Sequence, residues 1–577
     1  MRRAGACEEL ELAWELEPDE HILGTGERYD ALDQRGRNPD VRVYDQYKGQ
    51  GSRTYFPVPF FLSSSGYGLF VQSGGRVRFD FGHSAPEVLR IRVPVAGDGV
   101  GGRLFLGDPK QVLQGYAALA GRPGVLPDWA YGPWMSGNEW NSETRVREVV
   151  ERTLTEGIPA TVIVIEAWSD ETTFYLFADA EYEPVPGSDP IPLSAQRFGG
   201  RWPDPVGLVR WLHQKGLRLL LWQIPVLKDE EGHPQHDRDV THAEDHGFCV
   251  RTVEGGCYRN RGWWFPGARV LDFTNPEARR WWFAKRRYLV TELGVDGFKT
   301  DGGEHLWGAD VVTLGGERGD EAANRYPVHY QGAYHDFLRA CGHQRPLTFS
   351  RSGFAGAQRF PAHWAGDEDS TWEAFRASVT AGLSAGASGI AYWGWDLAGF
   401  SGSLPSAELY CRAAAMAAFC PIMQYHSEFD EHREPPIDRT PWNVAKQTGD
   451  PRVLDVYRLY ARLRMRLIPY LAQIGKEAAE TGLPLMRAMA LEFPDDPVCW
   501  EIADQFLLGP ALLVAPVLRE GVTERPVYLP RVEWRDFWSG QVARHGWIQA
   551  HAPLDRIPVF VREGPWAVPQ PPQEEVG

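Results

Sequence analysis

Between about residues 127 and 430 the chain alternates short apolar segments with longer amphipathic ones, which is the strongest constraint on its fold. Parallel strands joined by crossover helices produce this pattern, and eight repeats are the number in a TIM barrel. We therefore predict an α/β fold built on a (β/α)8 barrel. The predicted strands are Ala130–Ser136, Ala160–Trp168, Leu217–Pro225, Val295–Asp301, Pro346–Ser350, His363–Asp367, Gly389–Asp396 and Cys420–His426.

Several segments between and after these strands are predicted to be helical. Asn275 followed by Pro276 is a favoured helix start, because it combines an N-cap with proline in the first turn. Loops 170–204 and 226–262 are longer than connections require, so we expect them to shape the site. With its trailing helix, the catalytic domain is predicted to span 127–482. The predicted helices include Glu143–Gly157, Asn275–Leu293, Thr371–Gly386 and Asp450–Thr481.

Two regions of predicted β-structure flank the barrel. Within residues 1–126, TYFPVPFFLSSSGYGLFVQSGG alternates apolar and polar residues between Gly and Ser breaks, which predicts an N-terminal β-sandwich. Residues 483–577 contain short β runs broken by Pro and Gly, which predicts one or two C-terminal β-sandwiches. The polar, proline-rich tail from about residue 566 is expected to be disordered.

Charge and cysteine content exclude several classes of function. The formal net charge of -17 opposes binding to nucleic acids and to anionic membranes. The seven cysteines have no CxxC spacing, which favours a reducing compartment over a disulfide framework. Neither a secretion signal nor a membrane-spanning apolar run is evident. We expect a soluble, cytoplasmic protein, and assembly into a homo-oligomer is left open.

Catalytic residues of a TIM barrel lie at the carboxyl ends of its strands. Several predicted strands end in groups suited to a sugar, whose flat C–H faces pack on aromatic rings. The 23 tryptophans agree with this, although a large aromatic core explains them equally well. The strand-end residues are Glu166, Trp168, Trp222, Lys299, Asp301, Glu304, Arg351, Arg359, Trp364, Asp367, Trp395, Asp396 and His426.

The segment VDGFKTDGGE supplies the first candidate catalytic carboxylate. In a strand, Lys299 and Asp301 point to the same side, so the ammonium group favours an ionised carboxylate, as a nucleophile requires. Gly302 and Gly303 allow a sharp turn and close approach of a substrate. A surface Lys–Asp pair in a turn is the alternative interpretation.

The segment RFPAHWAGDEDSTW offers Asp367, Glu368 and Asp369 as the second carboxylate. We favour Asp367, because the nearby indole of Trp364 should raise the carboxyl pKa and keep the proton available for a leaving oxygen. Retaining glycosidases place two such carboxyls about 5–5.5 Å apart. The alternative for Asp367 is an N-cap of the following helix, a role that Asp369 or Ser370 could also fill.

Metal-dependent chemistry finds no support in the sequence. The 16 histidines form no HxH or HExxH motif and no compact cluster with cysteines. Two carboxylates are therefore the most economical catalytic set, and we expect neither a metal nor a cofactor.

At these residues the chain resembles glycoside hydrolase family 31, the α-glucosidase and α-xylosidase family. The most specific segments are FKTDGGE and SRSGFAGAQRFPAHWAGD, and the likeness extends from GTGERYDALDQRG through PVPFFLSSSGYGLFV to the C-terminal region. The resemblance implies Asp301 as nucleophile and Asp367 as acid/base. It also implies that the subsite of the cleaved sugar involves Lys299, Arg359, Trp364 and His426, with Trp222 beneath it and Asp396 nearby.

Three features depart from the family pattern. Many members carry an Asp that binds the distal hydroxyls, where this chain has Glu166, one methylene longer. Gly302 replaces the usual aromatic residue after the nucleophile, and the N-terminal sandwich is expected to be shortened. These changes leave glucose, xylose and galactose open as the sugar.

The sequence thus predicts a retaining, exo-acting α-glycosidase that acts on an α-linked oligosaccharide or glycoside. A transglycosylase or an α-glucan lyase on the same scaffold is one alternative, since both share the covalent intermediate. A non-catalytic sugar-binding protein is another, although the intact Asp301 and Asp367 argue against it.

Overall fold

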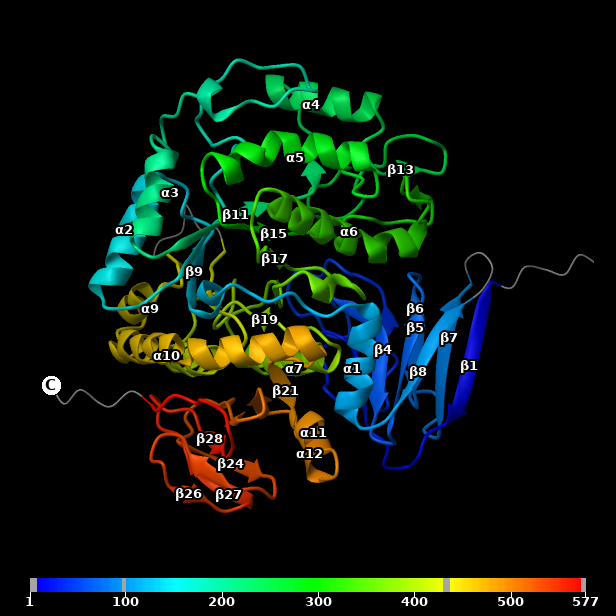
Figure 1. Ribbon diagram of the computed structural model, residues 1–577, viewed down its shortest axis with the longest axis vertical. Coiled ribbons are helices and arrows are strands. Elements are labelled where there is room, and N and C mark those ends of the chain that lie inside the picture. Colours follow the sequence, from blue (N-terminus) through cyan, green and yellow to red (C-terminus); the bar gives the residue numbers. More distant parts are fainter. Residues whose placement is uncertain (1–7, 96–99, 429–435, 572–577) are drawn as a thin grey trace, which may run out of the picture.

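The computed structural model describes residues 8–95, 100–428 and 436–571. Figure 1 shows a central barrel with an N-terminal sheet domain (blue) at one side and a C-terminal sheet domain (red) below it. The predicted α/β class, a barrel with β-sandwich domains before and after it, is confirmed. The domain boundaries at residues 126 and 482 stay predictions.

Eight parallel strands form the barrel, in the order β19-β18-β17-β15-β11-β10-β9-β20. Each overlaps one predicted segment, so all eight strand predictions are confirmed. The end strands meet through a bridge between Asp396 and Gln424 and a 3.0 Å hydrogen bond from the Ile422 N–H to the Trp393 carbonyl, which nearly closes the ring. The strands are β9 (Pro133–Gly137), β10 (Val162–Ile165), β11 (Arg218–Gln223), β15 (Gly297–Thr300), β17 (Thr348–Ser350), β18 (His363–Trp364), β19 (Trp393–Gly394) and β20 (Met423–Tyr425).

Helices cover the outside of the barrel. As predicted, Asn275 caps α5: its side chain accepts the N–H groups of Glu277 and Ala278, and Pro276 stands in the first turn. The long helix α10 ends at Gly482, whose φ of 83° suits a left-handed cap. The helices are α2 (Glu143–Thr155), α3 (Pro205–Gln214), α5 (Pro276–Thr291), α6 (Gly319–Ala340), α7 (Trp372–Ala387), α8 (Ala407–Ala417), α9 (Pro441–Thr448) and α10 (Arg452–Thr481), with 3-10 turns at Asp128–Tyr131, Leu193–Ala195 and Ala357–Arg359.

The N-terminal domain is a sandwich of two four-stranded antiparallel sheets, ordered β1-β7-β6-β3 and β2-β4-β5-β8. Alternating side chains divide its core: Phe61 and Ile91 pack between the sheets, whereas Phe60 and Leu62 face the barrel. Helix α1 (Pro109–Ala120) leads from this domain toward the barrel. The strands are β1 (Glu9–Glu15), β2 (Ile22–Gly26), β3 (Asp40–Val41), β4 (Pro57–Ser63), β5 (Tyr67–Gln72), β6 (Val77–Phe81), β7 (Val88–Pro94) and β8 (Gly101–Leu106).

The C-terminal domain pairs a six-stranded sheet, β21-β22-β23-β28-β25-β26, with the antiparallel pair β24-β27. Leu507 and Trp534 from the first sheet pack with Val527 from the second. Residues 566–571 form no helix or strand, and the rest of the predicted disordered tail lies outside the described residues. The elements are β21 (Met486–Ala488), α11 (Met489–Glu492), α12 (Val498–Glu501), β22 (Phe506–Leu508), β23 (Leu512–Val514), β24 (Glu524–Leu529), β25 (Trp534–Asp536), β26 (Val542–Ala543), β27 (Gly546–His551) and β28 (Val559–Arg562).

The long segment after β11 has secondary structure of its own. Its helix α4 lies beside α5 (Figure 1), held by a buried ion pair of 2.9 Å between Asp239 and Lys285. Beyond it the chain returns over the barrel through Trp263 and Trp264. The elements between β11 and α6 outside the barrel are β12 (Val226–Leu227), α4 (Pro234–Asp245), β13 (Arg251–Thr252), β14 (Arg269–Val270) and β16 (Val311–Val312).

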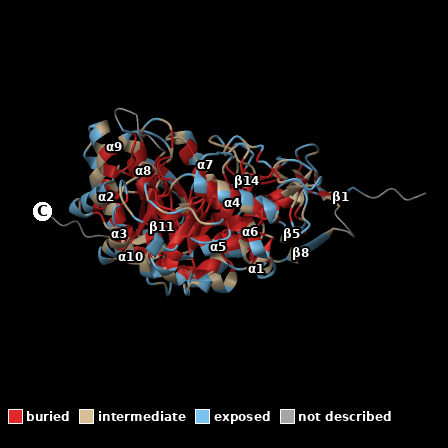
Figure 2. Cartoon of the chain, turned by 90° about the horizontal axis from the view of Figure 1, so that it is seen from above, coloured by how far each residue is buried: buried red, intermediate tan, exposed pale blue. Residues whose placement is uncertain are grey.

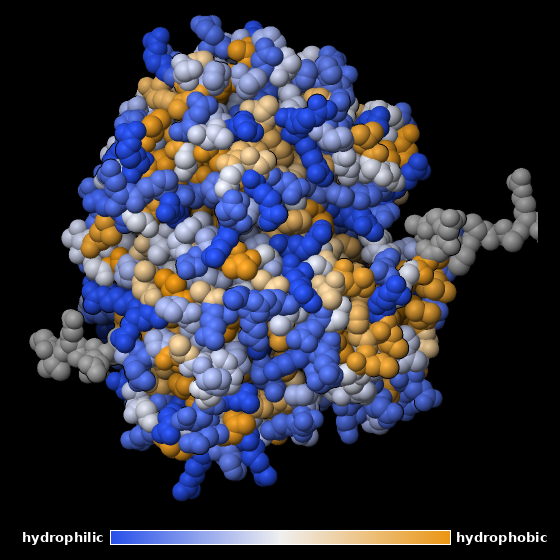
Figure 3. Space-filling model, in the orientation of Figure 1, coloured by the Kyte–Doolittle hydropathy of each residue, from blue (hydrophilic) through white to orange (hydrophobic). Residues whose placement is uncertain are grey.

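Burial follows this layered arrangement. Figure 2 shows buried residues concentrated inside the fold and exposed ones on the outer faces of the helices. In Figure 3, hydrophobic side chains gather over β8 and α1, where Leu104, Leu106 and Leu119 are exposed. Among the helices in the described ranges, none combines the length and apolar character needed to cross a bilayer. The six described cysteines are free thiols.

Candidate active site

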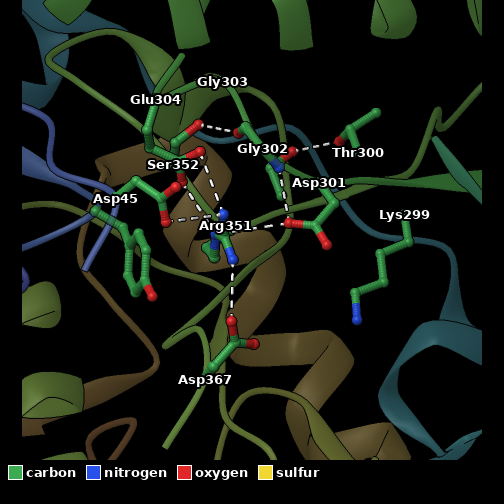
Figure 4. A network of polar contacts seen from close by, with 12 residues as sticks. Asp45, Lys299, Thr300, Asp301, Gly302, Gly303, Glu304, Arg351, Ser352 and Asp367 are labelled. Atoms are coloured by element: carbon green, nitrogen blue, oxygen red, sulfur yellow. Dashed lines mark hydrogen bonds and ion pairs between the residues drawn. The ribbon is translucent and has the colours of Figure 1, made fainter. Parts of the chain in front are cut away.

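Arg351 lies among four carboxylates, in a group that we name the Arg351 cluster (Figure 4). Its Nη1 lies 3.1 Å from Asp367 Oδ2, and its Nε lies 3.0 Å from Glu304 Oε1 and 3.5 Å from Asp301 Oδ1. Its Nη2 lies 3.6 Å from Asp45 Oδ1. Only 3% of the Arg351 side chain is exposed. The two predicted catalytic carboxylates therefore meet at one buried guanidinium.

The barrel topology explains this meeting. Strand β15 ends directly before Asp301, β17 ends directly before Arg351, and β18 ends shortly before Asp367. These three strands are neighbours in the parallel sheet, so their carboxyl ends lie side by side. Asp45 comes from the N-terminal domain, which places a fourth charged group against the same guanidinium.

Asp301 is held by neutral donors as well as by Arg351. The indole Nε1 of Trp222 donates to its Oδ2 at 2.9 Å, and the N–H of Gly302 donates to its Oδ1 at 2.7 Å. Gly302 has a φ of 75°, and a Cβ at this position would lie 2.5 Å from the His305 ring. The aromatic residue that is usual after the nucleophile therefore has no room here.

The Arg351 cluster concentrates negative charge, which favours protonated carboxyls. Burial raises the pKa of Asp367 to about 7, against the lowering effect of Arg351, and the charge of Asp301 adds to the rise. Burial likewise raises the pKa of Glu304 to about 7. The Asp367 side chain keeps 16% of its surface exposed. This carboxyl can thus hold a proton near neutral pH and still be reached.

A second group, the Lys299 group, forms around a buried ion pair. Lys299 Nζ donates to Glu166 Oε1, and Nε2 of His426 lies 3.1 Å from the same oxygen. The ammonium also lies 4.5 Å from the centre of the Trp364 ring. Lys299 therefore pairs with Glu166, and the expected Lys299–Asp301 pair is replaced by the contact between Asp301 and Arg351.

The partners of Glu166 decide its charge. Burial alone would raise the pKa of its carboxyl, but His426 and Lys299 outweigh this effect and lower the pKa to about 2. Burial raises the pKa of the neighbouring Asp396, whose Oδ1 accepts a 2.7 Å hydrogen bond from Gln424. The Lys299 group therefore carries an ionised carboxylate beside a second carboxyl whose pKa burial raises.

Several buried polar atoms of the Lys299 group have no hydrogen-bond partner among the described residues. They are Trp364 Nε1, Asp396 Oδ2 and His426 Nδ1. Native proteins rarely leave buried donors and acceptors unpaired, and a sugar offers hydroxyl groups that both donate and accept. The arrangement suits recognition of a sugar by its hydroxyl groups.

The structure does not bring Arg359 or Trp168 into contact with these groups. Arg359 is exposed, its Nε donates to the Gly356 carbonyl at 2.9 Å, and its side chain packs on Gly121. Trp168 is fully buried, and its Nε1 donates to the Trp222 carbonyl at 3.0 Å. Arg351, eight positions before Arg359, is the arginine at the carboxylates, whereas Trp168 supports the strand that carries Trp222.

The structure places Asp367 and Asp369 of this segment in different surroundings. Asp369 lies 3.2 Å from Lys48 Nζ and accepts a hydrogen bond from Ser401. Thr371 caps α7 by accepting the Ala374 N–H. Asp367 is therefore not needed as an N-cap, and it is the acidic residue of this segment that contacts Arg351.

Sequence reasoning missed two members of the site's surroundings. Asp45 lies in the N-terminal domain, and Trp264 lies in the long segment after β11, with its ring 4.9 Å from the Arg351 guanidinium. Neither position follows from strand periodicity. The length of that segment was the one available signal.

Within the described residues, no group of three or more His, Cys, Asp or Glu side chains is placed to hold a metal ion.

Comparison with known proteins extends over nearly the whole chain. Residues 123–474 match the model of the glycosyl hydrolases family 31 TIM-barrel domain, residues 482–565 its C-terminal domain, and residues 4–80 its N-terminal galactose mutarotase-like domain. The chain is 46% identical to the 1,3-alpha-isomaltosidase of Kribbella flavida, over 96% of this chain and 78% of that protein. It is 41% identical to the isomaltosyltransferase of Sporosarcina globispora, over 94% of this chain but 51% of that protein.

A solved structure agrees with these relationships. The cycloalternan-degrading enzyme from Trueperella pyogenes has a TM-score of 0.94 at 47% identity, with 96% of this chain and 81% of that chain covered. That enzyme is also known in complex with cycloalternan, with isomaltose and with a covalent intermediate. The family matches, the barrel and the two carboxylates at one guanidinium lead to one conclusion: this chain is a glycosidase that belongs to glycosyl hydrolase family 31.

Proposed function

We propose that the protein is a retaining, exo-acting α-glycosidase that releases isomaltose from α-1,3-linked isomaltosyl oligosaccharides. Asp301 is the nucleophile and Asp367 is the general acid/base. The observation that carries this proposal is the shared contact of both carboxylates with Arg351, at 3.5 Å and 3.1 Å. A retaining mechanism needs two carboxyls on one scissile bond, one ionised and one protonated.

In the first step, Asp301 attacks the anomeric carbon while Asp367 gives its proton to the departing oxygen. A pKa of about 7 for Asp367 suits this donation near neutral pH. In the second step, Asp367 removes a proton from water, which displaces Asp301 and releases the sugar as the α-anomer. Meanwhile the Lys299 group holds hydroxyls of the sugar, with Glu166 ionised.

The relatives support isomaltosyl as the transferred unit. The isomaltosidase and the isomaltosyltransferase are both named for this disaccharide, and the Trueperella pyogenes enzyme binds isomaltose. The covalent intermediate of that enzyme supports retention. Of the three sugars that the sequence left open, glucose fits these relatives.

The test is hydrolysis of isomaltosyl-α-1,3-isomaltose, with p-nitrophenyl α-glucoside and α-xyloside for comparison. We expect isomaltose as the product, and its α-anomer as the first signal in a proton NMR time course. A β-anomer at early times would overturn retention. Release of glucose or xylose in place of isomaltose would overturn the assigned unit.

Transfer to another sugar is the second candidate, favoured by the 41% identity to the isomaltosyltransferase. Transfer products would dominate at millimolar acceptor, whereas a hydrolase yields free isomaltose under the same conditions, and a lyase would yield an anhydro-sugar. A cytoplasmic location and a homo-oligomer stay predictions.

A further inference from the structure

An exposed aromatic pair lies beside the Arg351 cluster. Trp263 is 56% exposed, which is unusual for the largest apolar side chain. The ring of Tyr47 lies 5.6 Å from the Trp263 ring at an interplanar angle of 47°. Trp263 belongs to the long segment after β11 and Tyr47 to the N-terminal domain, so two distant parts of the chain build this pair.

Stacked rings connect the pair to the catalytic carboxylates. Trp263 stacks on Trp264 with centroids 6.3 Å apart and planes at 24°. Trp264 in turn lies 4.9 Å from the Arg351 guanidinium, which contacts Asp367. One indole therefore separates Trp263 from the guanidinium that touches the proposed acid.

Ion pairs and hydrogen bonds fix the segment that carries Tyr47. The Tyr47 hydroxyl donates to Glu428 Oε1 at 2.8 Å, and Lys48 Nζ lies 3.2 Å from Asp369 Oδ1. Two residues before Tyr47, Asp45 contacts Arg351 at 3.6 Å. The segment is thus anchored at three points around the mouth of the barrel.

The positions of Asp45 and Lys299 relate the aromatic pair to the leaving group. In Figure 4, Asp45 and Lys299 lie on opposite sides of Asp301. The Lys299 group carries the unpaired atoms suited to hydroxyls of the cleaved sugar, whereas Asp367 protonates the oxygen that departs. Tyr47 follows Asp45 by two residues and packs on Trp263, so the Asp45 side suits the departing sugars.

We propose that Trp263 and Tyr47 form a binding site for the sugars on the leaving side of the cleaved bond. This inference rests on the proposed function and adds to it the chemistry of the leaving group: a pyranose with a flat C–H face that packs on the indole. Substrates that extend past the cleaved bond use this site, and substrates with a small leaving group do not.

The experiment compares two substrates that differ only in the leaving group. Isomaltosyl-α-1,3-isomaltose places sugars against Trp263, whereas α-isomaltosyl fluoride releases a single ion. For Trp263→Ala we expect kcat/KM on the tetrasaccharide to fall at least about tenfold, mainly through KM, and to stay within about twofold on the fluoride. Trp263→Phe should retain most of the activity on both.

The chain provides a matched control in its C-terminal domain. Trp547 is 58% exposed and lies 5.3 Å from the Tyr528 ring at 55°, so Trp547→Ala removes a similar pair far from the site in sequence. Trp547→Ala should change kcat/KM neither on the tetrasaccharide nor on the fluoride. The inference fails if Trp263→Ala leaves the tetrasaccharide rate intact or lowers both rates equally. If the unmutated protein hydrolyses neither substrate, the proposed function fails and the inference falls with it.

Discussion

The guanidinium of Arg351 lies 3.1 Å from the carboxyl of Asp367, and both side chains are mostly buried. The same guanidinium contacts Asp301, Glu304 and Asp45. A single positive charge therefore offsets part of the repulsion among four acidic groups, at a place where water has little access. Because desolvated carboxylates repel one another strongly, the loss of this cation affects both the protonation of the site and its folding.

Replacement of Arg351 by Ala should lower kcat/KM by about 100-fold or more and the free energy of unfolding by about 3 kcal/mol, because it leaves buried carboxylates unpaired. Steady-state kinetics and denaturant unfolding measure the two effects. Arg359→Ala is the control. Because this side chain is exposed, the free energy of unfolding should change by no more than about 0.5 kcal/mol, and the activity should be retained. A larger effect of Arg359→Ala on kcat/KM would restore its predicted role in binding.

The pH dependence of the reaction should follow the proton on Asp367. Its pKa is raised to about 7, so the acid is present below that pH and is lost above it. For the tetrasaccharide, kcat/KM should fall about tenfold per pH unit on the alkaline side. Fluoride needs no proton to leave, so α-isomaltosyl fluoride should show no such decline in the same range. If kcat/KM fell on the alkaline side in the same way for both substrates, the assignment of Asp367 as the general acid would be contradicted.

Truncation of Asp367 to Ala should lower kcat/KM on the tetrasaccharide by about 10³-fold, since general acid catalysis contributes in that range. For the fluoride, the rate of the first step should fall far less, because fluoride leaves without a proton. Added azide should react with the accumulated intermediate and yield the α-azide, detectable by mass spectrometry and NMR. Asp301→Ala is the matched control and should abolish turnover of both substrates. Equal losses on both substrates for Asp367→Ala would contradict an acid role.

Glu166→Gln should destabilise the protein by about 3 kcal/mol, since it leaves the Lys299 ammonium buried without its anion. The pKa of Glu166 is lowered, so its contribution is present at neutral pH and lost as the pH falls below 4.5 toward 2. Thermal unfolding at pH 7 and at pH 3 measures this. Glu181→Gln is the control, because its ion pair with Arg197 is exposed on both sides and is worth about 0.5 kcal/mol or less.

Arg464 should matter for stability and not for chemistry. From α10 it donates to the carbonyls of Tyr131, Ala418, Cys420 and Pro421, next to the start of β9 and β20. Arg464→Met should lower the free energy of unfolding by about 3 kcal/mol, because these buried acceptors lose their donor. Urea unfolding checks this, and the kcat of the folded fraction should be unchanged.

The sequence by itself determined the barrel and both proposed catalytic carboxylates. Eight apolar segments with helices between them leave few other folds, because each strand must be buried on both faces. Asp301 and Asp367 follow strands, and strand ends share one rim of a barrel. These features depend on local periodicity, which a single sequence displays.

Only the tertiary structure decided which charges meet. Arg351 and Arg359 stand in one motif, and the turn after β17 places the first at the carboxylates and the second on the surface. Lys299 on β15 pairs with Glu166 at the end of β10, two strands away in the sheet, although Asp301 is closer in sequence. Asp45 and Tyr47 belong to the N-terminal domain. Contacts between residues far apart in sequence depend on how whole elements pack, and no local pattern of residues encodes that.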